Sequence, residues 1–394
     1  MTMAKDIIYN FDETVKRRGT SCFKWDELQN DDAIPMWVAD MDFKAAPEIQ
    51  MAIEKRIRHG VFGYAMVPDS YHEAVNGWFQ RHHNFTIPKE QMLYTTGVVP
   101  AISVIVKALT QPGDGVILQT PVYNCFFSSV RNNGCQVVEN PLIQDENGWR
   151  MDYDDLERKA VGERVKLLIL CNPHNPVGRV WTKEEMEKLN DICQRHRVKV
   201  VADEIHCGLV MPGHKYIPFA SISQATADNS INCNSASKSF NIAGLHLAYI
   251  FCNNPVIRKK IDRAINVNEV CDVNPLGIVA QTAAYNDGDE WIRQLNSYIY
   301  KNYQALCMFM QKELPQVKIS KLEGTYLVWA DIKALGIPTD TFTQKLEDEA
   351  RVKVSSGTIY GTKTGEGFIR INIACPRAQM DEALNRLATF VNQL

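Results

Sequence analysis

Short, continuous apolar runs separated by helix-forming segments constrain the fold of this chain more than any other feature. Two such runs, at 166–170 (KLLIL) and 199–202 (KVVA), have the length of strands. They lack the alternation of apolar and polar residues that is typical of a strand with one solvent-exposed face. Between them lies a helical segment, 182–195, in which Thr182 and Glu185 form a capping box. Strands buried on both faces occur in parallel sheets covered by helices. The sequence therefore predicts an α/β fold with a mostly parallel sheet.

The same alternation of strands and helices continues on both sides of these runs. Further strands are expected at 91–96, 115–119, 135–139, 231–234 and 247–252, and helices at 46–60, 71–83 and 99–110. The pattern changes near Asp289, after which we expect helices at 290–314, 341–350 and 378–392 and strands at 326–330 and 368–373. We predict a large domain (46–288), a smaller α+β C-terminal domain (289–394), and an N-terminal segment (1–45) that packs with the small domain.

Length and composition exclude several other classes of protein. A chain of 394 residues can bury a large core without disulfides or a structural metal. Its net charge of −3 argues against an electrostatic grip on nucleic acid or on an anionic membrane. No apolar run approaches the ~20 residues of a membrane span, and residues 1–12 lack the apolar core of a signal peptide. The 11 cysteines, an odd number without a C-x-x-C pair, are expected to be reduced thiols of a cytoplasmic protein.

Polar residues follow four of the predicted strands at the ends where open α/β sheets bind their ligands. In chain order they are Gly97 at a strand-to-helix turn, the segment 172–178 (NPHNPVG), Asp203, and the group Ser235, Ser237 and Lys238. Because the carboxyl ends of parallel strands meet at one edge, these groups are expected to converge there. The result would be an anion site, an amide, a carboxylate and a lysine in one place.

Each of these groups suits a different part of one cofactor. A glycine before a helix lets backbone N–H groups reach a phosphate, and a desolvated lysine forms a Schiff base with a carbonyl. A buried carboxylate needs a partner such as a protonated ring nitrogen. Phosphate, carbonyl and basic ring nitrogen together describe pyridoxal 5′-phosphate. Taken singly, Lys238 could be a surface lysine, Asp203 a helix cap, and Asn172–Pro176 a double turn, but their common placement favours the cofactor.

The order of these residues resembles that of the aspartate aminotransferase superfamily, the fold-type I pyridoxal phosphate enzymes. The resemblance rests on Asn175-Pro176-x-Gly178, then Asp203, then Ser-x-Ser-Lys238, then Arg370. Four segments resemble more narrowly the MalY/PatB type of C–S lyase: 35–43 (PMWVADMDF), 203–206 (DEIH), 237–245 (SKSFNIAGL) and 370–374 (RINIA). The resemblance covers nearly the whole chain, and it implies a large domain with a seven-stranded, mostly parallel sheet.

The resemblance also implies which residues bind the cofactor. Lys238 would hold it covalently, Asp203 would pair with its ring nitrogen, and Tyr123 would stack on its ring, these three being the catalytic groups. Asn175 and His206 would lie at the ring's 3′-oxygen, where transaminases carry a tyrosine in place of the histidine. The phosphate would be held by the backbone of Val98 and Val99, by Ser235 and Ser237, and by Tyr64 of a neighbouring subunit. The protein would accordingly be a homodimer with shared sites.

The same resemblance implies that four residues bind the substrate. Arg370 would clamp the α-carboxylate with its two parallel donors, and Asn175, Trp37 and Ala39 would lie beside the substrate. Ala39 stands where many aminotransferases have a glycine. His246 stands where many relatives carry a phosphate-binding arginine, and because it cannot supply that bidentate cation we assign it no role.

The implied reaction is an α,β-elimination in which Lys238 removes the Cα proton of cystathionine or a related cysteine thioether, releasing a thiol, pyruvate and ammonia. The alternative is transamination, which shares every step up to the carbanion and cannot be separated by cofactor-binding residues. A regulator that binds the cofactor without turnover is a third reading, but no appended DNA-binding helix pair supports it. The sequence does not select among thioethers.

Other suggestive residues have simpler explanations. Asp203, His206 and Cys207 have the ligand chemistry of a zinc site, but no second ligand pair accompanies them, so we expect no metal. The segment 361–367 (GTKTGEG) lacks the order of a phosphate-binding P-loop. The pair His82-His83 ends a predicted helix and is expected on a solvated face.

Overall fold

The computed structural model describes residues 7–146, 148–267 and 271–394. Residues 1–6, which belong to the predicted N-terminal segment and to the stretch considered as a signal peptide, lie outside the described residues. Within the described residues, no helix is both long enough and apolar enough to cross a membrane.

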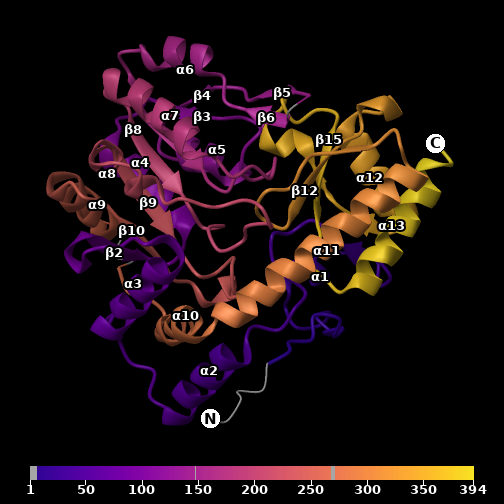
Figure 1. The fold of residues 1–394 in the computed structure, drawn as a ribbon, viewed down its shortest axis with the longest axis horizontal. Helices are drawn as coiled ribbons and strands as arrows, with labels where there is room; N and C mark the ends of the chain where they lie inside the picture. The colour runs from indigo at the N-terminus through magenta and orange to yellow at the C-terminus, as the bar shows by residue number, and fades with distance from the viewer. Residues whose placement is uncertain (1–6, 147, 268–270) are drawn as a thin grey trace.

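A seven-stranded sheet forms the centre of the larger part of the molecule (Figure 1). Its spatial order is β2 (Met92–Thr95), β10 (Ala248–Phe251), β9 (Ser230–Asn234), β8 (Lys199–Asp203), β7 (Val165–Cys171), β3 (Gly115–Leu118) and β4 (Gln136–Glu139). The strands from β9 to β4 are parallel, whereas β10 runs antiparallel to both of its neighbours. The predicted mostly parallel sheet within an α/β fold is therefore confirmed.

Helices cover both faces of this sheet because its strands are apolar on both faces. One face packs against α4 (Val98–Leu109), α5 (Asn124–Arg131) and α9 (Pro255–Val267). The other packs against α6 (Tyr153–Ala160) and α7 (Lys183–Arg195), with α8 (Gln224–Asn229) alongside. A third apolar cluster joins side chains of β10 and β2 to α2 (Pro47–His59), α3 (Asp69–His83) and α10 (Pro275–Asp287). The expected capping box of Thr182 and Glu185 begins α7.

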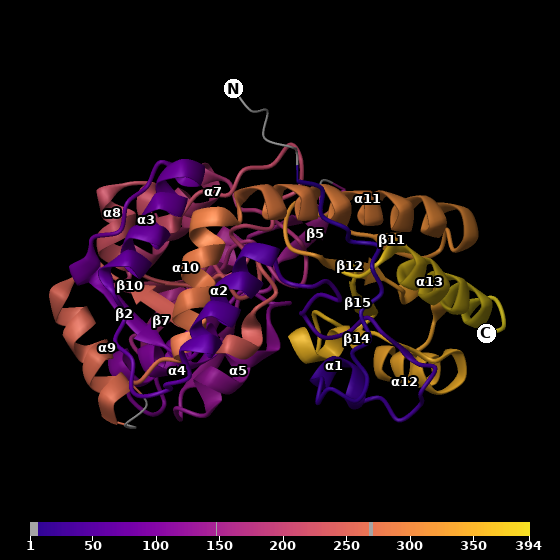
Figure 2. The ribbon, with the colours of Figure 1, turned by 90° about the horizontal axis from the view of Figure 1, so that it is seen from below.

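A smaller, antiparallel sheet lies in the C-terminal part of the chain. Its order is β11 (Lys318–Ile319), β12 (Leu327–Asp331), β15 (Phe368–Asn372) and β14 (Ser355–Ser356). The helices α12 (Thr339–Ala350) and α13 (Arg377–Val391) pack beside it. Figure 2 shows the long helix α11 (Asp289–Glu313) running from the larger part along the side of this smaller sheet.

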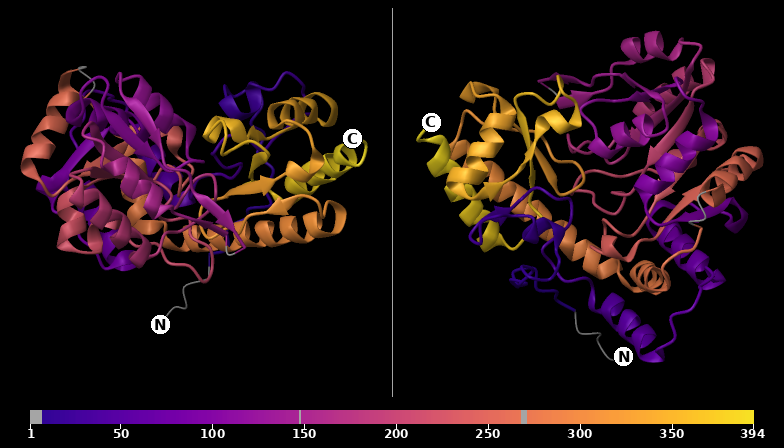
Figure 3. Two further views of the ribbon diagram at one scale, coloured as in Figure 1. Left: turned by 90° about the horizontal axis from the view of Figure 1, so that it is seen from above. Right: turned by 180° about the vertical axis from the view of Figure 1, so that it is seen from behind.

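The N-terminal chain lies against the C-terminal elements, as both views of Figure 3 show. It contains α1 (Phe23–Asp26) and β1 (Ile34–Pro35), and β1 pairs in parallel with β13 (Val352–Lys353). A small hairpin, β5 (Ile143–Asp145) with β6 (Gly148–Arg150), completes the strands. The domain boundaries at residues 45 and 288 remain a prediction.

Candidate active site

A cavity of about 290 Å³ opens at the carboxyl edge of the large sheet. Segments that are distant in the sequence line it together: Ala39, Thr96, Gly97, Val98, Val99, Pro100, Tyr123, Cys171, Asn175, Asp203, Ile205, His206, Ser237, Lys238, Ala243 and His246. We call it the lysine cavity. It brings together the anion site, amide, carboxylate and lysine that the strand ends predicted.

The sheet register explains why these side chains meet. Cys171 at the end of β7 lies opposite Asp203 at the end of β8, and Asp203 lies opposite Cys233 near the end of β9. When neighbouring parallel strands end at the same height in a sheet, the residues that follow them lie at the same edge. Asn175 and Lys238 belong to the turns that leave β7 and β9, so both reach the cavity.

Asp203 is a buried carboxyl group with little local compensation. Its Oδ1 accepts a hydrogen bond from the Ile205 backbone N–H at 3.1 Å. Burial raises its pKa to about 7, against smaller opposing effects from that N–H and from the charge of Lys238. A carboxyl group in this state gains from a cationic partner, and it fits a protonated ring nitrogen.

Lys238 points at the N-terminal segment. Its Nζ donates a hydrogen bond to the Ala39 carbonyl oxygen at 2.6 Å, and the Tyr326 hydroxyl donates to the same oxygen at 2.9 Å. Burial lowers the pKa of Lys238, and nearby Arg370 adds to this, while Asp40 opposes it. A depressed pKa favours the neutral amine, which is the form that attacks carbonyl carbon and removes protons.

The beginning of α4 offers an anion site in the same cavity. Val98 and Val99 are the first residues of this helix, and its N-cap, Gly97, supplies no side chain to satisfy their N–H groups. Uncapped N–H groups and the positive end of the helix dipole favour a phosphate there. Ser237 lines the cavity as well and brings a hydroxyl group.

Arg370, on β15, is buried and reaches the large-sheet residue Asn175. Its Nη1 donates to Asn175 Oδ1 at 3.1 Å, and its Nη2 donates to the Trp37 carbonyl oxygen at 2.6 Å. The guanidinium lies over the Tyr360 ring at 4.8 Å, and its buried Nε has no hydrogen-bond partner among the described residues. A buried guanidinium with an unused donor is suited to a carboxylate ligand.

His206 is also buried at this site. Burial lowers its pKa to about 3, and the charges of Lys238 and Arg370 act in the same direction. Its Nδ1 is buried, and no described residue forms a hydrogen bond with it. The ring is consequently neutral, and one ring nitrogen is available to a ligand oxygen.

Four predicted residues do not line the cavity in this single chain, and one of them, Arg370, reaches it only through its bond to Asn175. The Ser235 hydroxyl donates to the Leu247 carbonyl at 2.7 Å and accepts from Gln281 Nε2 at 2.9 Å, so it is already engaged. The Trp37 ring packs against Phe23 at 5.2 Å, and only its backbone carbonyl touches Arg370. Tyr64 is 98% exposed on the surface. Their assigned roles remain predictions.

Sequence reasoning assigned no role to several lining residues. Thr96, Pro100 and Ile205 adjoin residues that were assigned, so proximity to a strand end is the signal that finds them. Cys171 is the last residue of β7, and its Sγ accepts from the Asn175 backbone N–H at 3.4 Å. His246 also lines the cavity and has a left-handed φ of 46°. Lining alone gives it no function.

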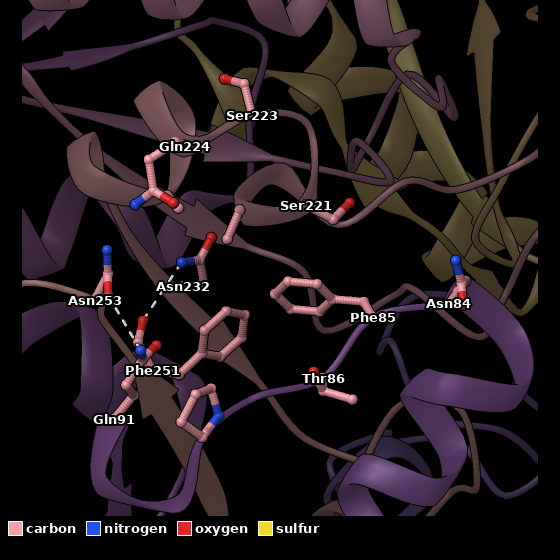
Figure 4. A pocket seen from close by; sticks show the side chains of 13 residues that line it. Asn84, Phe85, Thr86, Gln91, Ser221, Ser223, Gln224, Asn232, Phe251 and Asn253 are labelled. Atoms are coloured by element: carbon pink, nitrogen blue, oxygen red, sulfur yellow. Dashed lines mark hydrogen bonds between the residues drawn. The ribbon is translucent and has the colours of Figure 1, made fainter.

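A larger hollow, of about 400 Å³, lies elsewhere and lacks ionisable side chains (Figure 4). Its polar groups are amides and hydroxyls, and Gln91 Nε2 donates to Asn253 Oδ1 at 3.1 Å across it. Without an acid or base to activate a hydroxyl group, it has no means of catalysis. Among the described residues, no group of three or more histidine, cysteine or acidic side chains could hold a metal ion. The lysine cavity is therefore the candidate active site.

The fold and this cavity define a class of protein that comparison with known families identifies. Residues 38–387 match the family Aminotransferase class I and II. Since the match spans most of the sequence, the chain belongs to this family, and the predicted superfamily is confirmed.

Individual relatives are similar over the full length. Cystathionine beta-lyase PatB of Bacillus subtilis (strain 168) is 41% identical over 382 residues, which cover 96% of this chain and 98% of that protein. A PLP-bound protein of Clostridium difficile 630, provisionally described as an aminotransferase, has a TM-score of 0.95 at 42% identity, covering 98% and 100% of the two chains. Cystalysin from Treponema denticola, which contains pyridoxal 5′-phosphate, has a TM-score of 0.95 at 34% identity with the same coverage. The predicted type I fold is confirmed.

Proposed function

We propose that this protein is a PLP-dependent carbon–sulfur lyase that converts L-cystathionine or a related cysteine thioether into a thiol, pyruvate and ammonia. The observation that carries the proposal is the buried Lys238 amine in one cavity with Asp203 and Asn175, whose side chain Arg370 contacts. Relatives of the whole chain carry the same activity in their names, PatB as a cystathionine beta-lyase and a Staphylococcus hominis protein as a PLP-bound C–S lyase.

The residues of the cavity fit pyridoxal 5′-phosphate. The raised pKa of Asp203 reports a carboxyl group without a cation, which the ring nitrogen would supply. Val98, Val99 and Ser237 would hold the phosphate at the start of α4. Asn175 and His206 would bond to the ring's 3′-oxygen, and Tyr123 would cover the ring face. When bound, the cofactor supplies an electron sink for the pair of electrons left at Cα.

Each remaining step is assigned to a residue of the chain. The Arg370 guanidinium would bind the substrate carboxylate and fix the direction of the Cα–H bond. Lys238, whose pKa burial lowers, would take the Cα proton on Nζ. The bond from the β-carbon to sulfur then breaks, sulfur leaves as a thiolate, and the remaining aminoacrylate hydrolyses to pyruvate and ammonia.

Transamination is the rival reaction, since it uses the same lysine, aspartate and arginine. In that case Lys238 would return the proton to the cofactor rather than allow sulfur to leave. Three relatives favour the lyase: PatB, MalY and cystathionine beta-lyase of Corynebacterium glutamicum. An aminotransferase among the relatives, aspartate aminotransferase of Pyrococcus horikoshii, is 24% identical to this chain.

One assay separates the two reactions. Purified protein with pyridoxal phosphate is given L-cystathionine and no oxo acid, and pyruvate is followed over time. We expect many pyruvate molecules per site. Glutamate formed after 2-oxoglutarate is added, with the oxo acid of cystathionine in place of pyruvate, would show a transaminase and refute the proposal.

We also propose a homodimer in which Tyr64 completes the phosphate site of the partner. Tyr64 lies in an exposed apolar stretch with Val61, Phe62 and Met66. Such a stretch is costly in water unless another surface covers it. A hollow of about 710 Å³ lies nearby, between α2 and α10, and is lined by Lys55 and Ile278 among others.

Mixed subunits test the shared site. Lys238→Ala and Tyr64→Ala variants, each of low activity, are unfolded together, refolded and assayed. A mixed dimer should contain one intact site, with Lys238 from one chain and Tyr64 from the other, so activity should reappear on mixing. A mixture no more active than its components would show that the sites are not shared.

Two coarser predictions are kept as proposals. We propose that residues 46–288 and 289–394 form separate domains, with 1–45 packed on the second, because each contains its own sheet. We propose that the protein works in the cytoplasm, because all 11 cysteines are free, as the sequence suggested.

A further inference from the structure

The Ala39 segment, residues 36–43, is neither helix nor strand, and it places Ala39 in the wall of the lysine cavity. A segment of this kind lacks the regular hydrogen bonds that satisfy the backbone of a helix or a sheet. Each backbone carbonyl from Met36 to Met41 nevertheless accepts a hydrogen bond from a residue outside the segment. The position of the Ala39 segment is therefore set by its partners elsewhere in the chain.

Two asparagine side chains bind this segment beside Ala39. Asn372 Nδ2 donates to the backbone carbonyls of both neighbours of Ala39, at 2.5 and 2.6 Å. Asn241 Nδ2 donates to the carbonyls of Met41 and Phe43 at 2.9 and 2.8 Å, and Asn241 Oδ1 accepts from the Met41 backbone N–H at 3.0 Å. The carbonyl of Ala39 lies within this set of contacts, so the two asparagines fix its place.

Both asparagines share a local element with a residue assigned to the reaction. Asn241 belongs to the same turn, 236–241, as Lys238, and Asn372 belongs to the same strand, β15, as Arg370. Asn241 has a left-handed φ of 56°, which asparagine adopts more readily than most side chains. The Ala39 segment thus joins the turn that carries the lysine to the strand that carries the arginine.

The Ala39 carbonyl oxygen is the point where this network reaches Lys238. It accepts from Lys238 Nζ at 2.6 Å and from the Tyr326 hydroxyl at 2.9 Å, so both of its lone pairs are occupied. A hydrogen bond from a charged donor is stronger than one from a neutral donor. A carbonyl held beside Nζ therefore favours the ammonium form, and it favours that form less when Tyr326 shares the oxygen.

Other charged or titratable groups also face the Lys238 amine. They are Asp40, Arg370, Asp203, Cys125 and His206. Burial has the largest effect and lowers the pKa of Lys238, while Asp40 acts in the opposite direction. Because Asp40 belongs to the Ala39 segment, a looser segment would weaken both the carbonyl contact and the Asp40 charge. Both losses would disfavour the ammonium form.

We propose that Asn241 and Asn372 are positioning residues for Lys238. They fix the Ala39 segment, and the Ala39 carbonyl then holds one N–H of the free Lys238 amine, which sets the direction of the nitrogen lone pair that takes the Cα proton. Tyr326 shares the same oxygen and limits how strongly it holds the amine. The inference rests on the proposed function in one respect, that Lys238 is the base.

The first test measures the Lys238 amine in the cofactor-free, full-length chain. Lysine labelled with ¹³C at Cε is titrated by NMR, and Lys238→Ala identifies the resonance. Asn241→Gly removes the side chain without straining the left-handed backbone, and we expect the Lys238 titration to move to lower pH. Tyr326→Phe leaves the Ala39 carbonyl to Lys238 alone, so it should move the titration to higher pH.

The second test follows the Cα–H bond in the holoenzyme, with L-alanine in D₂O. The Cα–H bond breaks, Nζ takes the proton and exchanges it with solvent, and a deuteron returns to Cα. We expect Asn241→Gly and Asn372→Ala to slow this exchange about tenfold or more, because a base that is misplaced by about 1 Å can lose up to about 10²-fold in rate. L-alanine has no sulfur and no oxo acid is added, so this exchange tests the positioning even if the pyruvate assay refutes the lyase.

Asn84→Gly is the matched control. Asn84 also has a left-handed φ, of 50°, and it is not one of the residues that line the lysine cavity. This variant should change neither the titration nor the exchange rate.

Equal effects of Asn84→Gly and Asn241→Gly would show a general loosening of the fold and overturn the proposal. So would a Lys238 titration that Asn241→Gly and Tyr326→Phe leave unmoved or move in the same direction. Because Tyr326→Phe keeps the aromatic ring, it tests the Ala39 carbonyl even if Asn241→Gly fails to fold.

Discussion

Two aspartates are almost equally buried, but their carboxylates have different numbers of hydrogen-bond partners in the described structure. Asp203 is 4% exposed at the end of β8, and Asp42 is 3% exposed in the N-terminal chain. The Asp203 carboxylate accepts one hydrogen bond in the described structure, from the Ile205 N–H. The Asp42 carboxylate accepts from four side chains: Arg17 at 2.6 Å, Lys24 at 2.8 Å, Trp25 at 2.9 Å and Gln379 at 3.0 Å.

The pKa values of the two groups move in opposite directions for this reason. Burial raises the pKa of Asp203 to about 7. Burial would also raise the pKa of Asp42, but the charge and hydrogen bond of Lys24, with Trp25 and Arg17, lower it instead. A buried acid with its full set of partners holds a structure together, whereas one that lacks them is available to a ligand.

Removing the lysine beside Asp203 should have the largest effect on activity. Lys238→Ala loses the base and the covalent link to the cofactor, so turnover should fall by about 10⁴-fold or more. Mass spectrometry after borohydride reduction should find cofactor on the wild-type chain and none on the variant. Elimination at the wild-type rate by this variant would refute the assigned mechanism.

Exchanging each aspartate for asparagine should separate function from stability. Asp203→Asn removes the partner of the ring nitrogen, so kcat should fall about 10²–10³-fold with the thermal midpoint unchanged or raised. Asp42→Asn takes from the buried Lys24 the nearer of its two carboxylate partners, Asp42 at 2.8 Å, and leaves Asp40 at 3.5 Å. It should cost about 3–5 kcal/mol while the folded enzyme keeps its kcat within about tenfold. If both variants lost activity and stability alike, the contrast between the two acids would be wrong.

Stability should depend on pH with opposite signs at the two sites. Because folding raises the pKa of Asp203, its contribution to stability is present at low pH and is lost between the unfolded value near ~4 and about 7. In cofactor-free protein, the free energy of unfolding of wild type should therefore fall by on the order of 4 kcal/mol relative to that of Asp203→Asn as the pH rises over this range. Added pyridoxal phosphate should make this difference in unfolding free energy depend less on pH.

Asp42 follows the opposite rule, because its pKa is lowered. Its contribution is present above pH ~4 and is lost as the pH falls through its folded value. The gap in unfolding free energy between wild type and Asp42→Asn should close in acid. Denaturation curves at a series of pH values would measure both effects, and parallel curves for the two aspartates would contradict them.

The smallest predicted effect comes from one of the four donors to Asp42. Trp25→Phe removes the indole N–H but keeps the ring, so it should cost about 1–3 kcal/mol, the value of a hydrogen bond to a charged group. Its kcat should match that of wild type. A matched control is Trp329→Phe, since the buried Trp329 Nε1 has no hydrogen-bond partner in the described part of the chain. If both variants cost the same, ring packing rather than the hydrogen bond would explain the loss.

The sequence predicted elements best where one periodic pattern dominates. The apolar runs of β7 and β8 and the capped helix α7 appear within a residue or two of their expected bounds. The helix α10 was not predicted, because it is buried on most of its sides and has no polar stripe to mark its period. The antiparallel direction of β10 was not predicted either, since the pleat is the same in both directions.

By itself the sequence determined that glycine, amide, carboxylate and lysine would meet at one sheet edge, because the carboxyl ends of parallel strands all lie at the same edge. Only the tertiary structure decided what these groups touch. Lys238 meets the Ala39 carbonyl across 199 positions of sequence, and Arg370 meets Asn175 across 195. Local periodicity encodes which face of a strand or helix is buried, but such long-range partners, and the pKa values they set, depend on how the finished elements pack.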